Sequence, residues 1–158
     1  MPITRGELWQ LVEHPAVYVV TTNASVNNNG ELVMGRGAAL QATQRIPGIA
    51  MEAASLVDYR LGLLNRNDKP YGFVLVRQPR PEEEKYGFGI FQVKHAWDQP
   101  AKISLISHAM DILRMYALDK RDVTIRMNYP GIGLGGLPKS QVNLLLQDLP
   151  ENLHIFYK

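Results

Sequence analysis

The sequence contains no cysteine, and this absence excludes several kinds of chemistry. Disulfide bonds, zinc sites built on thiolates and cysteine nucleophiles all need that residue. A chain without any of them fits a reducing compartment, so we expect a cytoplasmic protein. Histidine is scarce as well, and the four histidines are scattered along the chain, which is not the spacing of a metal site. We therefore expect no metal and no bound cofactor.

The chain also has little excess charge of one sign. Its 17 basic and 15 acidic side chains give a formal net charge of +2. Proteins that hold nucleic acid through phosphate contacts alone cluster many more Lys and Arg residues, so any recognition of an anion must be local. No apolar run approaches the ~20 residues of a membrane span, and residues 1–10 lack the basic-then-apolar pattern of a signal peptide. We expect no association with membranes.

What the sequence does have is enough apolar material for a core. It has 158 residues, of which 46% are hydrophobic and 20% charged, a balance typical of a folded domain. No segment repeats with a period of 20 to 50 residues. We expect one domain over residues 1–158, and a monomer.

Strand-like and helix-like stretches alternate along the chain. The run at 16–22 is short, β-branched and aromatic, as in a strand buried on both faces of a sheet. Between such runs, apolar residues spaced three and four apart indicate helices. Further strands are expected at 71–77, 89–93, 123–127 and 153–157, and helices at 37–44, 48–64, 103–118 and 140–146. This alternation predicts a three-layer α/β/α fold with a largely parallel sheet.

In such sheets ligands bind beyond the carboxyl ends of the strands. The loops that follow Thr22, Val93 and Met127 are therefore the places to look for chemistry. The polar, proline-bearing stretch 78–86 has another character, and we expect it to be a solvated, hairpin-like connection.

The first of these loops, 23–40, is rich in asparagine and glycine. Gly30, Gly35 and Gly37 permit positive φ angles and close approach of the backbone to a ligand, and the loop leads directly into a helix. A phosphate or a ribose would fit there, although asparagine and glycine are also common in flexible connectors. The apolar residues at 32–34 indicate that the loop folds back and packs.

The second glycine-rich loop is YPGIGLGGL at 129–137. Its glycines satisfy the pattern G-x-G-x-x-G, but a dinucleotide-binding fingerprint belongs early in a fold and is followed by further βαβ units. The loop is not a P-loop either, because Leu-Pro-Lys-Ser follows Gly136. What remains is a physical property: consecutive backbone N–H groups beside a helix start can hold a diphosphate without a metal.

Two such loops on neighbouring strand ends would hold a diphosphate from both sides, and with them the sequence resembles the macrodomain family of ADP-ribose-binding proteins. The resemblance is carried by Gly6 and Glu7, a buried strand that ends in Asn23, MGRGAAL at 34–40 and PGIGLGGL at 130–137. It implies a three-layer α/β/α fold with a central mixed, mostly parallel sheet.

Within the family, MGRGAAL and QVKHAW at 92–97 are similar to the branch of terminal ADP-ribose protein glycohydrolase and of bacterial antitoxins that remove ADP-ribose from DNA thymidine. By this resemblance Asn23 holds the distal ribose. Glu7 stands where most members have an aspartate that contacts the adenine amino group. The remaining binding residues are Met34, Gly35, Arg36 and Gly37 in the first loop and Gly131, Ile132, Gly133, Leu134, Gly135, Gly136 and Leu137 in the second.

Lys94 is the candidate catalytic residue. In the resembling branch a lysine at this position is a nucleophile that attacks the anomeric carbon of the distal ribose. The chemistry needs a neutral amine, which a partly desolvated pocket or a cationic neighbour such as His95 would favour. Alternatively, Lys94 merely extends from a strand end into solvent. Trp97, three residues on, either lies on the ligand side or packs.

The glycohydrolase has an assisting aspartate in its second loop, where this chain has Gly135; the antitoxins lack it and share Gly135, Gly136 and Leu137. We therefore favour removal of ADP-ribose from a nucleobase over removal from a protein carboxylate. The expected partners are ADP-ribose and ADP-ribosylated DNA or protein. Two alternatives stay open, a non-catalytic ADP-ribose reader and a phosphatase acting on ADP-ribose 1-phosphate.

Overall fold

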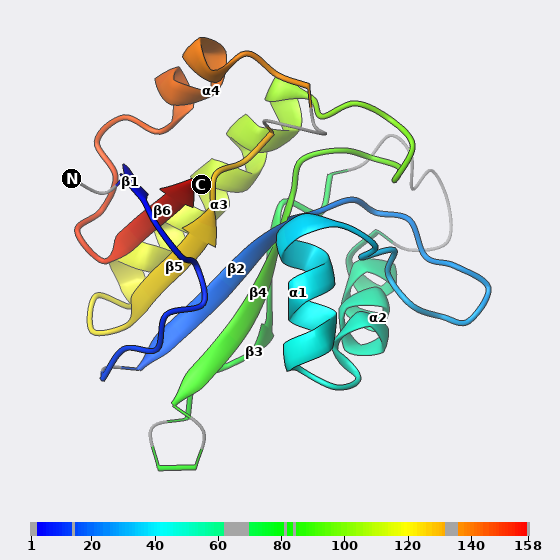
Figure 1. The fold of residues 1–158 in the computed structure, drawn as a ribbon, viewed down its shortest axis with the longest axis horizontal. Coiled ribbons are helices and arrows are strands. Elements are labelled where there is room, and N and C mark those ends of the chain that lie inside the picture. Colours follow the sequence, from blue (N-terminus) through cyan, green and yellow to red (C-terminus); the bar gives the residue numbers. More distant parts are fainter. Residues whose placement is uncertain are drawn as a thin grey trace.

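The structure is a computed structural model that describes residues 3–13, 15–61, 70–80, 82–83, 85–131 and 136–157. Its centre is a six-stranded sheet with the strand order β1-β6-β5-β2-β4-β3 (Figure 1). The strands are β1 (Ile3–Arg5), β2 (Ala16–Thr22), β3 (Phe73–Arg77), β4 (Tyr86–Gln92), β5 (Thr124–Asn128) and β6 (Leu153–Tyr157), and the helices are α1 (Gly37–Arg45), α2 (Ile49–Leu61), α3 (Ile103–Asp119) and α4 (Lys139–Leu145).

Every neighbouring pair of strands is parallel except β3 and β4. The exception follows from the short polar connection between these two strands, since only antiparallel neighbours can be joined without a crossover. The predicted hairpin is thus confirmed, and so is the mixed, mostly parallel sheet.

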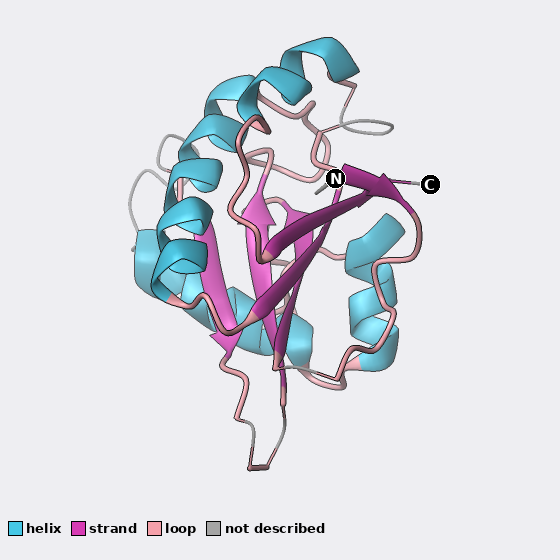
Figure 2. Cartoon of the chain, turned by 90° about the vertical axis from the view of Figure 1, so that its left-hand side faces the viewer, coloured by secondary structure: helices cyan, strands magenta, loops and turns pink. Residues whose placement is uncertain are grey.

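Helices cover both faces of the sheet, as Figure 2 shows from the side. Alternate residues of β2 explain this: Tyr18 and Val20 pack with α1 and α2, whereas Val17 and Val19 pack with α3 and α4. A strand that contributes to two cores must be apolar on both sides, and this accounts for the continuous apolar run at 16–22. The three-layer α/β/α architecture is confirmed.

The sequence prediction was wrong at the start of β4, which begins at Tyr86 and not at residue 89. Glycine weakens a strand signal, but here glycine is needed for packing. A Cβ atom on Gly87 would lie 2.5 Å from the carbonyl oxygen of Arg77, and one on Gly89 would lie 2.6 Å from Cε1 of Phe73. Close approach of β3, which has a register shift between Leu75 and Arg77, therefore explains both glycines.

The other predicted elements agree with the structure to within about two residues, and residues 62–64 of the second predicted helix lie outside the described part of the chain. No helix in the described ranges combines the length and apolar character needed to cross a membrane.

Candidate functional site

The carboxyl ends of β2 and β5 separate and leave a crevice. The two strands pair as far as Val19 and Met127; beyond that point a side chain replaces the backbone ladder. Asn128 Oδ1 accepts a hydrogen bond from the Thr21 backbone N–H at 3.0 Å, and its Nδ2 donates to Thr21 Oγ1 at 2.9 Å. Such a separation at the strand ends is where ligands bind in open α/β sheets.

Two cavities open into this crevice, one of about 210 Å³ and one of about 830 Å³. They have four lining residues in common, Gly37, Ala38, Asn128 and Tyr129. The start of α1 and the end of β5 therefore form the junction of one continuous groove. A groove with a narrow arm and a wide arm suits an elongated ligand with unlike ends.

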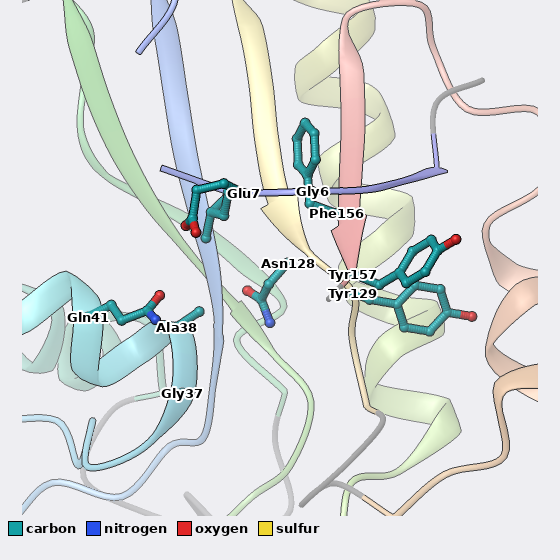
Figure 3. Close-up of a pocket in the computed structure, with 10 residues that line it drawn as sticks. Gly6, Glu7, Gly37, Ala38, Gln41, Asn128, Tyr129, Phe156 and Tyr157 are labelled. Carbon is teal, nitrogen blue, oxygen red and sulfur yellow. The ribbon is translucent and has the colours of Figure 1, made fainter. Parts of the chain in front are cut away.

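The narrow arm lies between the segment after β1, helix α1 and the end of β6. Figure 3 shows Glu7 and Gln41 on one side of Asn128 and Phe156 on the other. Gln41 Oε1 accepts a hydrogen bond from Trp9 Nε1 at 2.8 Å, so the NH₂ group of Gln41 remains to donate elsewhere. One wall of this arm thus has a carboxylate and an amide, and the other has an aromatic ring.

A buried arginine holds this arm together. Arg126 donates to the carbonyl oxygens of Leu8 at 3.0 Å and Glu7 at 2.8 Å, and its guanidinium lies 4.0 Å from the centre of the Phe156 ring. Burial lowers the pKa of Arg126, while Tyr18 and Glu7 act in the opposite direction. Because arginine stays charged in proteins, these contacts place Glu7 across the end of the sheet.

The junction lies at the N-terminus of α1. Arg36 precedes the helix in an extended conformation without a side-chain capping bond, Gly37 has a φ of 58°, and the first turn contains no acidic residue. The first backbone N–H groups of a helix have no partner within the helix, and they carry a partial positive charge. An uncapped start that opens into a cavity is therefore suited to an anion such as a phosphate.

The first glycine-rich loop packs as its apolar residues indicate. Leu32 is buried and forms an antiparallel bridge with Val26, and its backbone N–H donates to the carbonyl of Ala50 at 3.0 Å. The predicted binding residues Met34, Gly35, Arg36 and Gly37 all line the wide arm. Met34 is buried and fixes the loop, whereas Gly35 and Arg36 are exposed.

The second glycine-rich loop is described only at its two ends, because Ile132, Gly133, Leu134 and Gly135 lie outside the described residues. Gly131 is buried, has a φ of 79° and lines the wide arm. Its carbonyl accepts a hydrogen bond from the Leu137 N–H at 2.9 Å, which closes the base of the loop. Leu137 packs against the core on the α3 side, and Gly136 is exposed.

The wide arm also contains Asn23 and Lys94. Asn23 is buried, its Oδ1 accepts from the Ser25 N–H at 2.9 Å and its Nδ2 donates to the carbonyl of Val33 at 3.1 Å. One amide hydrogen of Asn23 remains for a ligand. Lys94 Nζ donates to the carbonyl of Trp97 at 3.0 Å, and Trp97 is 60% exposed at the rim.

Tyr129 connects the junction to helix α4. Its hydroxyl donates to Asn143 Oδ1 of α4 and is 3.3 Å from the carbonyl oxygen of Lys139. Burial raises the pKa of this tyrosine, so at neutral pH it is a neutral hydrogen-bond donor that ties β5 to α4.

The sequence prediction missed Asn128, Phe156 and Gln41. Asn128 could have been found from the sequence, since it is a polar residue directly after the predicted strand at 123–127. Phe156 and Gln41 offered none, because an aromatic residue in a strand and a glutamine in a helix are ordinary. Among the residues that the structure describes, no three His, Asp or Glu side chains are grouped to hold a metal ion.

No model of a protein family matches the sequence, and the search of curated proteins finds no match. Solved structures do match: a macrodomain protein from Streptomyces coelicolor superposes with a TM-score of 0.68 at 18% identity, covering 99% of this chain and 97% of that one. The chain has the macrodomain fold, as the resemblance implied.

Three further solved structures share this fold. The macrodomain of Thermus aquaticus DarG has a TM-score of 0.69 at 22% identity, covering 99% of this chain and 96% of that chain. The macrodomain of Mycobacterium tuberculosis DarG has a TM-score of 0.68 at 23% identity, with 99% and 97% covered. DarTG from Thermosipho africanus, solved in complex with ADP-ribose, matches at a TM-score of 0.62 and 18% identity, and this chain covers 38% of it.

Proposed function

We propose that this protein binds ADP-ribose in the continuous groove and hydrolyses an ADP-ribosyl linkage at its wide end. The observation that carries the proposal is the order of groups along the groove. A carboxylate and an aromatic ring line the narrow arm, uncapped helical N–H groups lie at the junction, and a lysine amine and an asparagine amide line the wide arm. ADP-ribose has the same order of parts: adenosine, diphosphate and ribose.

In this arrangement the adenine lies in the narrow arm. Its planar ring is suited to stack on Phe156, and its amino group is a donor for which the Glu7 carboxylate is an acceptor. The Gln41 amide adds a second polar group on the same wall. A base presenting a carbonyl where adenine has its amino group would instead meet the negative charge of Glu7.

The diphosphate lies at the junction, against the N–H groups of Gly37 and Ala38 and beside Gly131. Two negatively charged phosphates are stabilised there by the dipole of α1 and by Arg36 on the rim. No metal is required, because backbone donors and the helix end supply the positive potential.

The distal ribose then enters the wide arm between Asn23 and Lys94. In the proposed reaction the neutral Lys94 amine attacks the anomeric carbon, a C–N bond forms, and the bond to the departing group breaks with its electron pair. The departing group takes up a proton. Water then hydrolyses the lysyl intermediate, releasing ADP-ribose and the free amine.

The hydrogen bond from Lys94 to the Trp97 carbonyl is compatible with this role. A neutral amine that donates one N–H keeps its lone pair for attack. For the departing group we favour a nucleobase, as the sequence comparison with the antitoxin branch implies, and the exposed indole of Trp97 beside the wide arm offers a surface on which a base can stack.

The test has two steps. Calorimetric titration with ADP-ribose, set against AMP and NAD, should give the tightest binding for ADP-ribose. The protein is then incubated with ADP-ribosylated single-stranded DNA and with an ADP-ribosylated glutamate peptide, and released ADP-ribose is quantified. Release from the DNA supports the favoured substrate, release from the peptide alone shifts the substrate to protein, and release from neither removes the hydrolase.

One observation favours a second candidate, a non-catalytic ADP-ribose reader. The Lys94 amine is already held by a carbonyl oxygen, and a lysine in this position would also serve to bind the ribose. A reader would bind ADP-ribose and release nothing.

A further inference from the structure

Ser25 is not part of the binding groove, yet it connects two groups of the proposed active site. Its backbone N–H donates to Asn23 Oδ1 at 2.9 Å, and its Oγ accepts a hydrogen bond from the Trp97 backbone N–H at 3.1 Å. The Trp97 carbonyl in turn accepts from Lys94 Nζ at 3.0 Å. A single chain of hydrogen bonds therefore runs from Asn23 through Ser25 and Trp97 to the Lys94 amine.

We infer that Ser25 is a positioning residue that sets the Lys94 amine relative to the ribose held by Asn23. The inference rests on the proposed function and deepens it, since it concerns the same site. Asn23 follows β2 and Lys94 follows β4. The two strands pair as far as Thr22 and Gln92, and beyond that point Asn23 and Lys94 stand in separate turns.

Two backbone hydrogen bonds of the described residues tie these segments together at the strand ends. The Val93 N–H donates to the carbonyl of Thr22 at 2.9 Å, and the Ala24 N–H donates to the carbonyl of His95 at 3.0 Å, which fixes the start of the turn at 94–97. The far end of that turn carries the Trp97 carbonyl that holds the amine. Among the described residues, the Ser25 hydroxyl is the side-chain group that ties this end to the segment at 23–26. Removing the hydroxyl should therefore loosen the Trp97 end and leave the Ala24 end in place.

The Ser25 backbone is anchored independently of its hydroxyl. Its carbonyl accepts from the Val33 N–H at 2.9 Å, and its N–H bond to Asn23 needs no side chain. A Ser25→Ala variant should accordingly fold and keep the ribose-binding amide of Asn23 in position. What it loses is the placement of the amine, and a misplacement of about 1 Å can lower a rate by about 100-fold.

Hydrogen exchange tests the bond directly. In Ser25→Ala, the Trp97 amide should exchange at least about tenfold faster by NMR, because this N–H loses its partner, whereas the Ala24 amide should keep its rate. Unchanged exchange at Trp97 would overturn the inference. Ser55→Ala is the matched control, since the Ser55 hydroxyl bonds to the Met51 carbonyl on the exposed side of α2, outside the lining of the groove.

Kinetic measurements test whether losing the Ser25 hydroxyl misplaces the Lys94 amine. Ser25→Ala should lower kcat by about 10- to 100-fold while the dissociation constant of ADP-ribose changes by less than about threefold, and Ser25→Thr, which keeps a hydroxyl, should restore most of kcat. An unchanged kcat, or a loss of affinity as large as the loss of kcat, would contradict a positioning role. The second result would mean that Ser25 contacts the ribose itself.

A wild-type protein that cleaves neither substrate would remove the proposed hydrolase, and the position of the amine is then measured without turnover. The aldehyde of ring-opened ADP-ribose condenses with an amine and loses water, and cyanoborohydride reduces the imine. Mass spectrometry of the adduct on Lys94 gives the yield. A lower yield in Ser25→Ala supports the inference, and an equal yield overturns it.

Discussion

Asn128 of β5 holds Thr21 of β2 through two hydrogen bonds, one to its backbone N–H and one to its hydroxyl. This pair takes over where the backbone ladder between the strands ends, and the same asparagine lines both arms of the groove. The Asn128 side chain therefore links β5 to β2 beyond the end of the ladder and also lines the crevice.

Replacing this asparagine should separate its two roles. Asn128→Ala leaves the Thr21 N–H without its acceptor and should lower the free energy of unfolding by about 1 kcal/mol, measured by denaturant titration. Asn128→Asp keeps an acceptor for that N–H, and the Thr21 hydroxyl can reverse its direction of donation. It should fold about as stably as the wild type.

The aspartate nevertheless places a negative charge beside the proposed diphosphate site. ADP-ribose should bind to Asn128→Asp at least about tenfold more weakly at low salt, with part of the loss recovered as salt screens the repulsion. Equal affinity in wild type and Asn128→Asp would mean that the diphosphate lies elsewhere.

Lys94→Ala distinguishes an enzyme from a reader. If the amine is the nucleophile, the variant should lose turnover by about 1,000-fold or more and keep its ADP-ribose affinity to within about threefold, because truncation removes the chemistry and one contact. Lys102→Ala, a nearby exposed lysine outside the groove lining, should retain wild-type turnover. A reader would show no turnover to lose.

Gly131→Ala tests the base of the second glycine-rich loop. The residue has a φ of 79°, and an added Cβ would lie 2.7 Å from Ile106 Cδ1. The variant should lose about 1–3 kcal/mol of unfolding free energy and bind ADP-ribose more weakly. Gly35→Ala, where a Cβ meets nothing within 4 Å, should stay within about 0.5 kcal/mol of the wild type. Equal stability of both variants would contradict this account.

Glu7→Ala should reduce the selection of adenine. Removing the carboxylate that faces the narrow arm should weaken ADP-ribose binding by about tenfold, as expected for a hydrogen bond to a charged group, and bring the affinities for ADP-ribose and inosine diphosphate ribose closer together. Calorimetry with both ligands measures this. Glu13→Ala, an exposed carboxylate outside the groove lining, should leave both affinities unchanged.

His154 should make stability fall in mild acid. Burial, reinforced by the adjacent Arg126, lowers the pKa of His154 in the folded protein below its ordinary value of 6.5. As pH falls below about 6.5, His154 becomes protonated in the unfolded chain but stays neutral in the folded protein. The free energy of unfolding therefore decreases until the folded histidine is protonated as well. Above that pH this loss is absent.

His154→Gln should therefore lose less stability than the wild type between pH 7 and pH 5, as measured by denaturant titration at each pH. His154→Asn should show the same smaller loss of stability. Wild-type slopes in both variants would remove His154 as the cause.

The two tryptophans show where sequence reasoning stops. Trp9 is buried, stacks on Tyr18 with ring centres 5.5 Å apart and donates to Gln41, whereas Trp97 lies open on the rim of the groove. Both stand in loops beside predicted binding residues. The local sequence around them does not show which of the two is buried in the core and which is exposed at the rim of the groove. Burial depends on which segments cover a side chain, and those segments are distant in sequence.

The order of elements and the places to look for a ligand followed from the sequence. The apolar run at 16–22, the three-and-four spacing of the helices and the two glycine-rich loops depend on residues close together in the chain, and short-range patterns report short-range structure. On that basis the fold and the loops that line the groove were predicted, and the resemblance to macrodomains then singled out Asn23 and Lys94 within those loops.

Only the tertiary structure decided how the groove is assembled. Glu7 and Phe156 come from the two ends of the chain and Gln41 comes from α1, and they meet because β1 pairs with β6 and α1 packs over β2. The split between β2 and β5, and the hydrogen-bond chain through Ser25, likewise depend on strand register. Local patterns state which residues favour a strand or a turn; which distant atoms come within 3 Å is determined by the packing of the whole core, because many side chains must fill one volume together.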